Sequence, residues 1–410
     1  MKKSYLMIAA ATIIFAACSG NDSFKEIAED NETVKIGFET FHEKSTKAAV
    51  SAKEDLNSAN GGFGVFGYNH TDKRAVANGS IDMTTTGTTT VFNNVKVWYE
   101  DNSTPTRGFT YEVPKYWDKY KYYTFFAYAP WNETTITLTP STGKFTRTDV
   151  QSIQSTNAAT PSTVTVGSNS RTKYTDAVET SVIDYLFAVC VPQQKYAATN
   201  QTTYDGYQKT VGFTFSHILS KLNVIVKAKN EASGHQYKGV KDIQITSLSI
   251  DNLPNTAANV TYTQTATDGV TGTFSPANYT TSLNIIGGTN ALTAGPLYIL
   301  DGGATGTPII APTTYIDQAF HYWVAPNTPT GTDHDKYKLN INYTINYVDD
   351  TVDPFTRTID LSAETAHFTT MAQNNIYNIT VTIGLDQIYF DVDEIVGWAS
   401  PENNTNTEIN

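Results

Sequence analysis

Cysteine, basic residues and long apolar runs are all scarce in this chain. Only two of its 410 residues are cysteine, which excludes a fold held together by a set of disulfides. Lysine and arginine number 28 against 40 acidic residues, and the net charge of −12 argues against nucleic acid as a partner. The longest apolar run extends from Leu6 to Ala17, short of the roughly 20 residues that a helix needs to cross a bilayer. We therefore expect no membrane-spanning helix.

The apolar run belongs to a leader sequence. Lys2 and Lys3 give it a positive start and Ala16 and Ala17 a small-residue end, which together predict a secretory signal peptide. Cys18 follows directly, and Ala-Ala-Cys resembles the bacterial lipobox, in which the chain is cut before the cysteine and the sulfur is acylated. We expect Cys18 to carry such a lipid anchor, which holds firmly when it has more than one acyl chain. The alternative is an ordinary signal peptide with an incidental cysteine.

Helical periodicity is also lacking, because no window of helical length carries apolar residues at three- and four-residue spacing. Apolar and polar residues instead alternate along 222–228, 339–347 and 377–385. Period-two alternation predicts half-buried strands in antiparallel sheets. The chain is longer than the roughly 250 to 300 residues that one core usually serves. We therefore predict an all-β protein with two tandem β-sandwiches.

Changes in composition suggest where these units begin and end. Residues 19–33 are polar and charged without periodicity, which is typical of a flexible tether. A polar stretch over 197–208 precedes a strand-like run. The predicted segments are a signal peptide over 1–17, a lipidated tether over 18–33, an N-terminal sandwich over 34–207, a C-terminal sandwich over 208–399 and a polar tail over 400–410.

Motifs for catalysis or metal binding are missing. The sequence has no G-x-S-x-G, H-E-x-x-H or P-loop pattern, and its seven histidines are scattered. Asp391 and Asp393 could share a strand face and attract calcium, but the apolar residues between them favour the wet side of an amphipathic strand. We predict no catalytic residues, no metal site and no cofactor, and a protein that is not an enzyme.

The aromatic run over 116–131 has two interpretations. Exposed tyrosine and tryptophan rings can bind the faces of sugars, and Trp131 is placed to be exposed. However, apolar residues occupy both registers of the run near Phe125 and Phe126, which favours a strand buried on both faces. Burial in a core is the favoured interpretation.

Several segments, taken in order, resemble the fimbrillin-like proteins of Bacteroides and its relatives. They are GGFGVFGYN (61–69), KYYTFFAYAPW (121–131) and VGFTFSHILSKLNVIV (211–226), and the likeness extends to 36–50 and to the end of the chain. These family members are lipoprotein precursors of surface fimbriae. The resemblance implies transthyretin-like sandwiches. It also implies a location on the surface of the outer membrane and then in the extracellular fimbrium.

The resemblance further implies that a protease trims the chain after its first strand. That strand is expected over 34–41, with Ile36, Phe38 and Phe41 as its apolar residues. Family trimming is best known after arginine, but no arginine occurs before Arg74. The expected cut is therefore between Lys47 and Ala48, with Lys44 as second choice, and two solvated loop lysines are the alternative interpretation.

Loss of the first strand would open a groove that a strand from another subunit fills, which is β-strand addition. The candidate donor residues lie near the end of the chain: Ile388, Phe390, Val392, Ile395 and Trp398. The alternative role for the same residues is a final strand of the second sandwich.

The resemblance thus predicts a structural fimbrial subunit that is lipidated at Cys18 and polymerised by strand exchange. Its expected partners are other copies of itself, other fimbrial subunits, the outer-membrane lipid, and host or bacterial surface receptors. An untrimmed tip or anchor component of the same family is the first alternative. A glycan-binding surface lipoprotein that uses exposed aromatic rings is the second.

Overall fold

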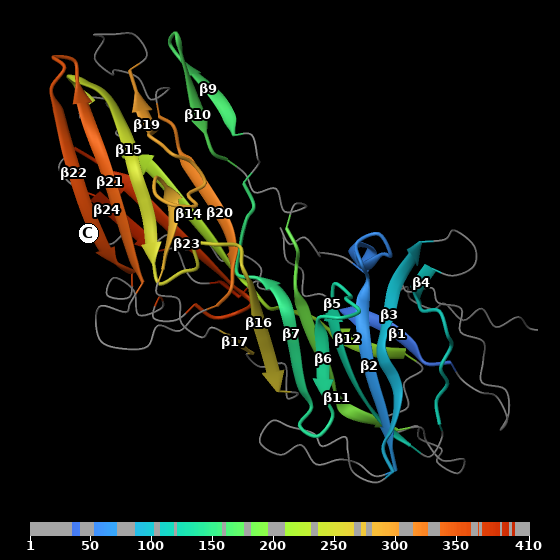
Figure 1. Cartoon of the computed structure of the whole chain (residues 1–410). Coiled ribbons are helices and arrows are strands. Elements are labelled where there is room, and N and C mark those ends of the chain that lie inside the picture. Colours follow the sequence, from blue (N-terminus) through green and yellow to red (C-terminus); the bar gives the residue numbers. More distant parts are fainter. Residues whose placement is uncertain are drawn as a thin grey trace, which may run out of the picture.

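The computed structural model describes most of the chain between Lys35 and Gly397. The described residues are 35–41, 53–71, 87–101, 107–118, 121–157, 161–175, 182–195, 210–230, 237–265, 272–275, 281–302, 315–326, 337–361, 368, 371–385, 388–392 and 396–397. Figure 1 shows an elongated molecule with two β-rich lobes, one built mainly from the first half of the chain and one mainly from the second.

A six-stranded antiparallel sheet forms the centre of the N-terminal lobe. Its strands, in order across the sheet, are β13 (Ser216–His217), β11 (Leu186–Lys195), β5 (Tyr122–Ala129), β2 (Phe63–His70), β3 (Thr89–Asp101) and β4 (Arg107–Thr110). A glycine allows two aromatic rings to pack closely against β2. A Cβ atom at Gly67 would lie 2.8 Å from the ring of Phe92 and 2.9 Å from the ring of Phe125. Only glycine therefore fits at this position of β2.

Both faces of this sheet are covered. On one face lies a two-stranded sheet made by β1 (Gly37–Phe41) and β12 (Thr210–Thr214), together with the short 3₁₀ helix η1 (Lys53–Leu56). On the other face lies a four-stranded sheet with the order β17 (Thr273–Ser275), β16 (Asn259–Thr265), β7 (Lys144–Gln151) and β6 (Ile136–Thr139). Seven of the eight residues of β5 are consequently buried, which confirms the prediction of a strand buried on both faces.

The C-terminal lobe is a sandwich of two sheets around a second core. One sheet has the order β24 (Ile388–Val392), β23 (Asn375–Ile383), β14 (Ser220–Ala228), β20 (Gln318–Val324) and β8 (Ile153–Ser155), and β25 (Val396–Gly397) also pairs with β23. The other has the order β18 (Ser282–Ile286), β15 (Val240–Asp251), β21 (Lys338–Tyr347) and β22 (Val352–Asp360), with β19 (Leu297–Asp301) also paired to β15. A separate hairpin is formed by β9 (Ser162–Val166) and β10 (Asn169–Lys173).

The predicted all-β class is confirmed. In β21, for example, Leu339, Ile341, Tyr343 and Ile345 are buried while the residues between them are partly or fully exposed, as the alternation predicts. One feature differs from the prediction of antiparallel sheets, because β1 pairs with β12 and β14 with β23 in parallel. Parallel neighbours need long crossover connections, and sequence alternation carries no information about strand direction.

Strand pairing links the two predicted sandwich segments. β7 and β8 come from before residue 207, yet they pair with β16 and β20, which come from after it. The division between residues 207 and 208 stays a prediction. The signal peptide, the tether and the polar tail lie outside the described residues. Among the residues that are described, no helix is long and apolar enough to span a membrane.

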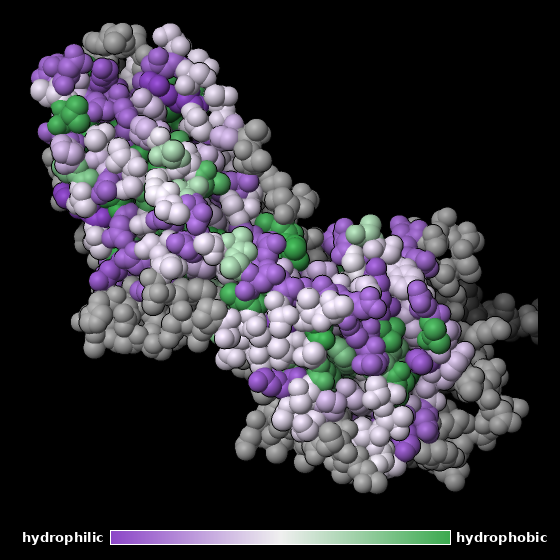
Figure 2. Space-filling model, viewed as in Figure 1, coloured by the Kyte–Doolittle hydropathy of each residue, from purple (hydrophilic) through white to green (hydrophobic). Residues whose placement is uncertain are grey.

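Few large hydrophobic side chains are exposed on the described surface. Figure 2 shows hydrophilic residues over most of the visible face, with apolar residues in small separate groups. Among the side chains that the structure describes, the large hydrophobic ones that are exposed are Val113, Tyr116, Ile183 and Val352, at 39 to 62% of their surface. Trp131 is half-buried, its indole Nε1 donates to the carbonyl oxygen of Asn94 at 3.1 Å, and Lys96 lies over its ring. Tyr116 is thus the one aromatic member of the exposed set.

Candidate functional site

The first described strand, β1, is attached to the fold along one side. Its residues pair in parallel with β12, with Gly37 opposite Thr210 and Phe41 opposite Thr214. Within the described residues, β12 is the only strand that pairs with β1. The amide of Ile36 donates to the carbonyl oxygen of Lys115 at 2.8 Å, just before the strand begins. β1 is therefore an edge strand: it covers a core, and among the described strands it has a strand partner on one side only.

The inward side chains of β1 complete the core of the N-terminal lobe. Ile36 is fully buried and Phe38 is 5% exposed. The ring of Phe38 lies 5.3 to 6.3 Å, centroid to centroid, from five other aromatic rings, which are Phe63, Phe92, Tyr111, Phe125 and Phe213. Aromatic pairs at this separation contribute beyond their buried area. Phe38 is thus the central contact of the strand with the rest of the fold.

Side chains alternate along β1 between the core and the surface. Thr40 is buried on the same side as Ile36 and Phe38, whereas Lys35 and Glu39 are exposed. Phe41 is the last residue of β1 and pairs with Thr214 of β12. The first strand predicted from the sequence is therefore present as β1, and its role as a removable strand stays a proposal.

Other predicted processing residues fall where the structure gives no description. Cys18, Lys44, Lys47 and Ala48 lie outside the described residues. The described chain ends at Phe41 and resumes at Lys53. The predicted cleavage positions therefore fall between β1 and η1 in the sequence.

Three of the five candidate donor residues are brought together in β24. Ile388, Phe390 and Val392 lie opposite Ile383, Val381 and Ile379 of β23. Among the described strands β24 is at the edge of its sheet, and the half-buried Ile388 packs against the C-terminal core. Ile395 and Trp398 lie outside the described residues. This arrangement is the final strand of the second sandwich, and a donor role for the same residues stays a proposal.

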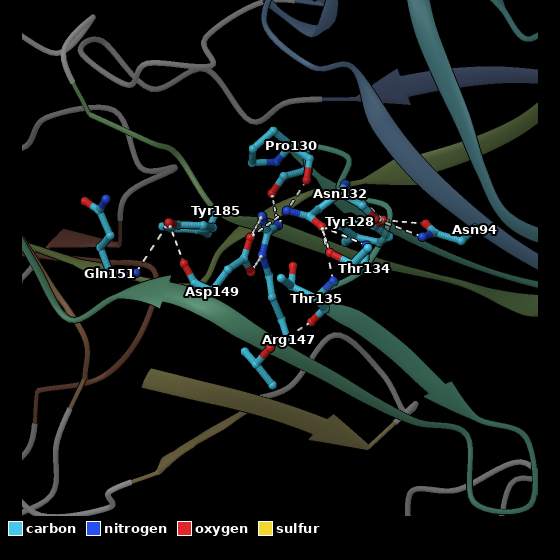
Figure 3. Close-up of polar contacts among 12 residues, drawn as sticks. Asn94, Tyr128, Pro130, Asn132, Thr134, Thr135, Arg147, Asp149, Gln151 and Tyr185 are labelled. Atoms are coloured by element: carbon cyan, nitrogen blue, oxygen red, sulfur yellow. Dashed lines mark hydrogen bonds and ion pairs between the residues drawn. The ribbon is translucent and has the colours of Figure 1, made fainter. Parts of the chain in front are cut away.

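A buried polar cluster that the sequence analysis did not identify fixes β7 to the N-terminal sheet (Figure 3). Arg147, only 1% exposed, donates from Nε to Asp149 Oδ1 at 2.6 Å and from Nη2 to Oδ2 at 3.1 Å. Its Nη1 donates to the carbonyl oxygens of Ala129 and Pro130 at 2.9 and 3.2 Å. Arg147 and Asp149 are two apart on one strand, and this opposite-charge spacing was the only sequence signal for the pair.

Tyrosines complete this cluster. The guanidinium of Arg147 lies 4.6 Å from the ring centroid of Tyr185 and 5.5 Å from that of Tyr128. Tyr185 donates its hydroxyl to the backbone oxygen of Asp149 at 2.9 Å, and Tyr128 donates to Asn94 Oδ1 and to the backbone oxygen of Asn132. Arg147, Asp149, Tyr128 and Tyr185 all bond to protein atoms, so the cluster acts as a structural clamp between β5, β7 and the residue directly before β11.

A buried histidine and carboxylate pair, His217 and Asp184, also has structural contacts. His217 Nδ1 lies 2.8 Å from Asp184 Oδ1, and the ring of His217 meets Trp323 edge to face. The backbone amide of His217 donates to Asn374 Oδ1 at 3.4 Å. These contacts join β13 to the C-terminal lobe. Over the described part of the chain, no group of three or more His, Cys, Asp and Glu side chains is placed to hold a metal ion.

Buried tyrosines make the fold sensitive to alkaline pH. Burial raises the pKa of Tyr111 and of Tyr128 from the ordinary value of 10.0 to about 12, against the opposing effect of backbone hydrogen bonds. A pKa that is higher in the folded state gives stability that is complete below pH 10 and is lost as pH rises through the folded pKa. We therefore expect the free energy of unfolding to fall between pH 10 and pH 12.

Tyrosinate absorbance measured together with circular dichroism checks this expectation. In the folded chain a fraction of the tyrosines should ionise only above pH 11, whereas in urea all of them should ionise near pH 10. Ionisation of every tyrosine near pH 10 with an unchanged circular dichroism spectrum would contradict the assigned burial.

Comparison with known proteins gives structural neighbours only. No family model and no curated protein matches the sequence. A fimbrial protein from Bacteroides vulgatus is similar at 20% identity and a TM-score of 0.48, over 89% of this chain and 99% of that one. A protein described as a putative cell adhesion protein from Bacteroides uniformis is similar at 16% identity and a TM-score of 0.40, over 89% and 98%.

A fimbrial assembly protein from Parabacteroides distasonis is similar at 10% identity and a TM-score of 0.32, over 89% of this chain and 99% of that one. These three structural neighbours are therefore described as a fimbrial protein, a putative cell adhesion protein and a fimbrial assembly protein, all at low sequence identity.

Proposed function

We propose that this chain is a non-enzymatic structural subunit of a bacterial cell-surface fimbria. It is exported as a lipoprotein acylated at Cys18, loses its first strand to a protease, and polymerises by β-strand addition. The leader sequence, the lipobox and the ordered segments that resemble fimbrillin-like proteins support this proposal. The observation that carries it is the attachment of β1, an edge strand that places its side chains at the centre of a core.

Removal of β1 would leave a slot that has to be filled. Ile36 and Phe38 are buried, and burying such a side chain contributes about 1.5 to 3 kcal/mol each. The slot would be lined by aromatic rings, and β12 would expose the backbone groups that β1 now satisfies. An open sheet edge of this kind pairs with any extended chain that fits it. A strand from another subunit supplies both the backbone partners and the apolar side chains.

The positions of the processing residues suit this sequence of events. A cut between Lys47 and Ala48, or after Lys44, separates β1 and everything before it from the rest of the chain. The acylated Cys18 would leave with that fragment. The subunit would thus pass from the surface of the outer membrane into the extracellular fimbrium.

The donor strand in this proposal comes from the last residues of a neighbouring subunit. Its partners are other copies of the chain and other fimbrial subunits, with host or bacterial surface receptors reached through the assembled fibre. Tyr116 is the one exposed aromatic residue among the side chains that the structure describes, so a broad platform of aromatic rings for glycans gains no support from that surface.

The intact mass and N-terminal sequence of the protein taken from the surface of its native cells test the proposal. We expect protein in the fibre fraction to begin at Ala48 or just after Lys44. A variant carrying Lys44→Gln and Lys47→Gln should stay untrimmed and be absent from fibres, whereas Lys53→Gln, a change in the exposed start of η1, should behave as wild type. Fibre protein that begins at acylated Cys18 would contradict trimming and favour an anchor or tip component.

A further inference from the structure

A second element besides β12 holds the start of β1. Residues 111–118, which we call the β4–β5 segment, follow β4 and lie beside the residues that lead into β1. The amide of Ile36 donates to the carbonyl oxygen of Lys115 at 2.8 Å, and Lys35 forms an antiparallel bridge with Tyr116. The pairing of β1 with β12 begins only at Gly37. The two residues before β1 are thus bonded to the β4–β5 segment.

Tyr111 makes the central contacts of this segment. Its hydroxyl donates to the carbonyl oxygen of Ile36 at 2.7 Å and accepts from the amide of Lys115 at 3.3 Å. Its ring is 4% exposed and lies 5.6 Å from that of Phe38, centroid to centroid. Lys35 Nζ lies 4.8 Å from the centroid of the same ring. One side chain therefore contacts three residues in and directly before β1.

The hydroxyl of Tyr111 is a permanent donor under ordinary conditions. Burial raises the pKa of Tyr111 to about 12, so the hydroxyl keeps its proton near neutral pH. A hydrogen bond of this kind, buried between a hydroxyl and a backbone carbonyl, is costly to break because the carbonyl is left without a partner. The contact with Ile36 thus opposes departure of the strand.

Both ends of the β4–β5 segment are fastened to the N-terminal lobe. At one end the ring of Tyr111 lies 5.5 Å from that of Phe92 in β3. At the other end Trp117 is 6% exposed, with its ring 4.7 Å from that of Tyr123 in β5. The amide of Asp118 donates to the hydroxyl of Tyr123 at 2.7 Å. The segment therefore holds the start of β1 against a fixed support.

This support lies at the end of β1 that is farther from the predicted cut. The segment holds Lys35 and Ile36, whereas the cut is expected beyond Phe41, after Lys47 or Lys44. A cut chain frays from its new end, because terminal residues have the fewest contacts. While the start stays bonded, the frayed residues remain at high effective concentration and close again.

We infer that the β4–β5 segment retains β1 after the chain is cut, so that cutting and release are two separate steps. This inference rests on the proposed function and concerns the regulation of its first strand. The predicted lipid tether leads into the fold at Lys35, so a pull from the membrane reaches the β4–β5 segment before it reaches Phe38. The cut subunit stays attached to its anchor until this segment lets go of the strand.

The rate at which the cut fragment leaves tests the inference. The full chain carries an inserted site for a sequence-specific protease between Lys47 and Ala48, and a tag after Asn410 holds it on a resin at low density. After cutting in detergent, mass spectrometry of the wash follows the loss of the N-terminal fragment. The wild-type fragment should stay bound and leave slowly. Tyr111→Phe should release it roughly fivefold to tenfold faster, because the bond to Ile36 is lost while the ring remains.

Tyr116→Phe is the matched control in the same segment. The side chain of Tyr116 is 48% exposed and its backbone makes the bridge to Lys35, so this variant should release the fragment at the wild-type rate. Hydrogen exchange of the uncut chain is a second readout. Tyr111→Phe should speed exchange over 35–41 and leave β5 unchanged, whereas Tyr116→Phe should alter neither. Equal release from wild type and Tyr111→Phe, or loss of the wild-type fragment as soon as the chain is cut, would overturn the inference.

The inserted site separates this inference from the proposed function, because it makes the cut independent of natural trimming. Retention that depends on Tyr111, together with fibre protein that begins at acylated Cys18, would support the inferred role of the segment and contradict the trimming step. Immediate loss of the wild-type fragment, together with fibre protein that begins at Ala48, would overturn the inferred role alone.

Discussion

Replacing Phe38 with alanine is expected to lower the free energy of unfolding by about 3 to 5 kcal/mol. The ring is 5% exposed and contacts five aromatic rings, four from the six-stranded sheet and its connections and one from β12. Alanine would remove the buried area and leave a cavity, because rings held by a sheet relax only in part. Urea unfolding followed by circular dichroism gives the change as a shift of the midpoint at constant slope.

Glu39 provides the matched control in the same strand. Its side chain is exposed, so Glu39→Ala should change stability by no more than about 0.5 kcal/mol. A loss below about 1 kcal/mol for Phe38→Ala would mean that β1 does not complete the core in solution. That result would also remove the reason for filling the slot after trimming.

Replacing Arg147 with methionine is expected to lower the free energy of unfolding by about 3 to 5 kcal/mol, the usual effect of removing one partner of a buried ion pair. Methionine keeps much of the apolar contact with the tyrosine rings but donates no hydrogen bond. Asp149 would lose both bonds to the guanidinium, and the carbonyl oxygens of Ala129 and Pro130 would lose their donor. Thermal or urea unfolding of the purified chain measures the loss.

Arg357 is a suitable control because it is exposed on β22, with its guanidinium 5.6 Å from the ring centroid of Phe355. Arg357→Met should cost less than about 1 kcal/mol. Adding Asp149→Asn to Arg147→Met should recover part of the loss, since it removes the charge that Arg147→Met leaves unpaired on the half-buried Asp149. An additive double variant would show that the two side chains do not act as a pair.

Strand content followed directly from side-chain alternation. The segments over 222–228 and 339–347 lie within β14 and β21, and 377–383 lies within β23, which ends at Ile383, before the predicted Leu385. Period-two patterning is a local property, because it reflects one wet and one dry face along a few consecutive residues. The aromatic run near Phe125 was interpretable for the same reason, since apolar residues in both registers require cover on both faces.

Strand partners were beyond the reach of the same reasoning. β1 lies beside β12, with Gly37 opposite Thr210, although most of the N-terminal lobe separates them in sequence. The pairing of β7 with β16 likewise joins residues far apart in the chain. Which strands pair depends on how their side chains pack in the assembled core, so the pairing cannot be predicted from the sequence of either strand alone.

The polar cluster around Arg147 likewise could not be predicted from the sequence. Arg147 and Asp149 appear in the sequence as two ordinary charged residues of a strand. The burial of Arg147 depends on Ala129, Pro130 and Tyr185, which lie at the end of β5, directly after β5, and directly before β11. A charged residue is buried only where partners from several elements converge on it.

By itself the sequence determined the all-β class, because the alternation of apolar and polar side chains is written in neighbouring residues. Only the tertiary structure decided that β1 is an edge strand in parallel with β12 and that Phe38 lies among five aromatic rings. These properties depend on which distant segments pack together, since burial and hydrogen bonding are set by the completed core.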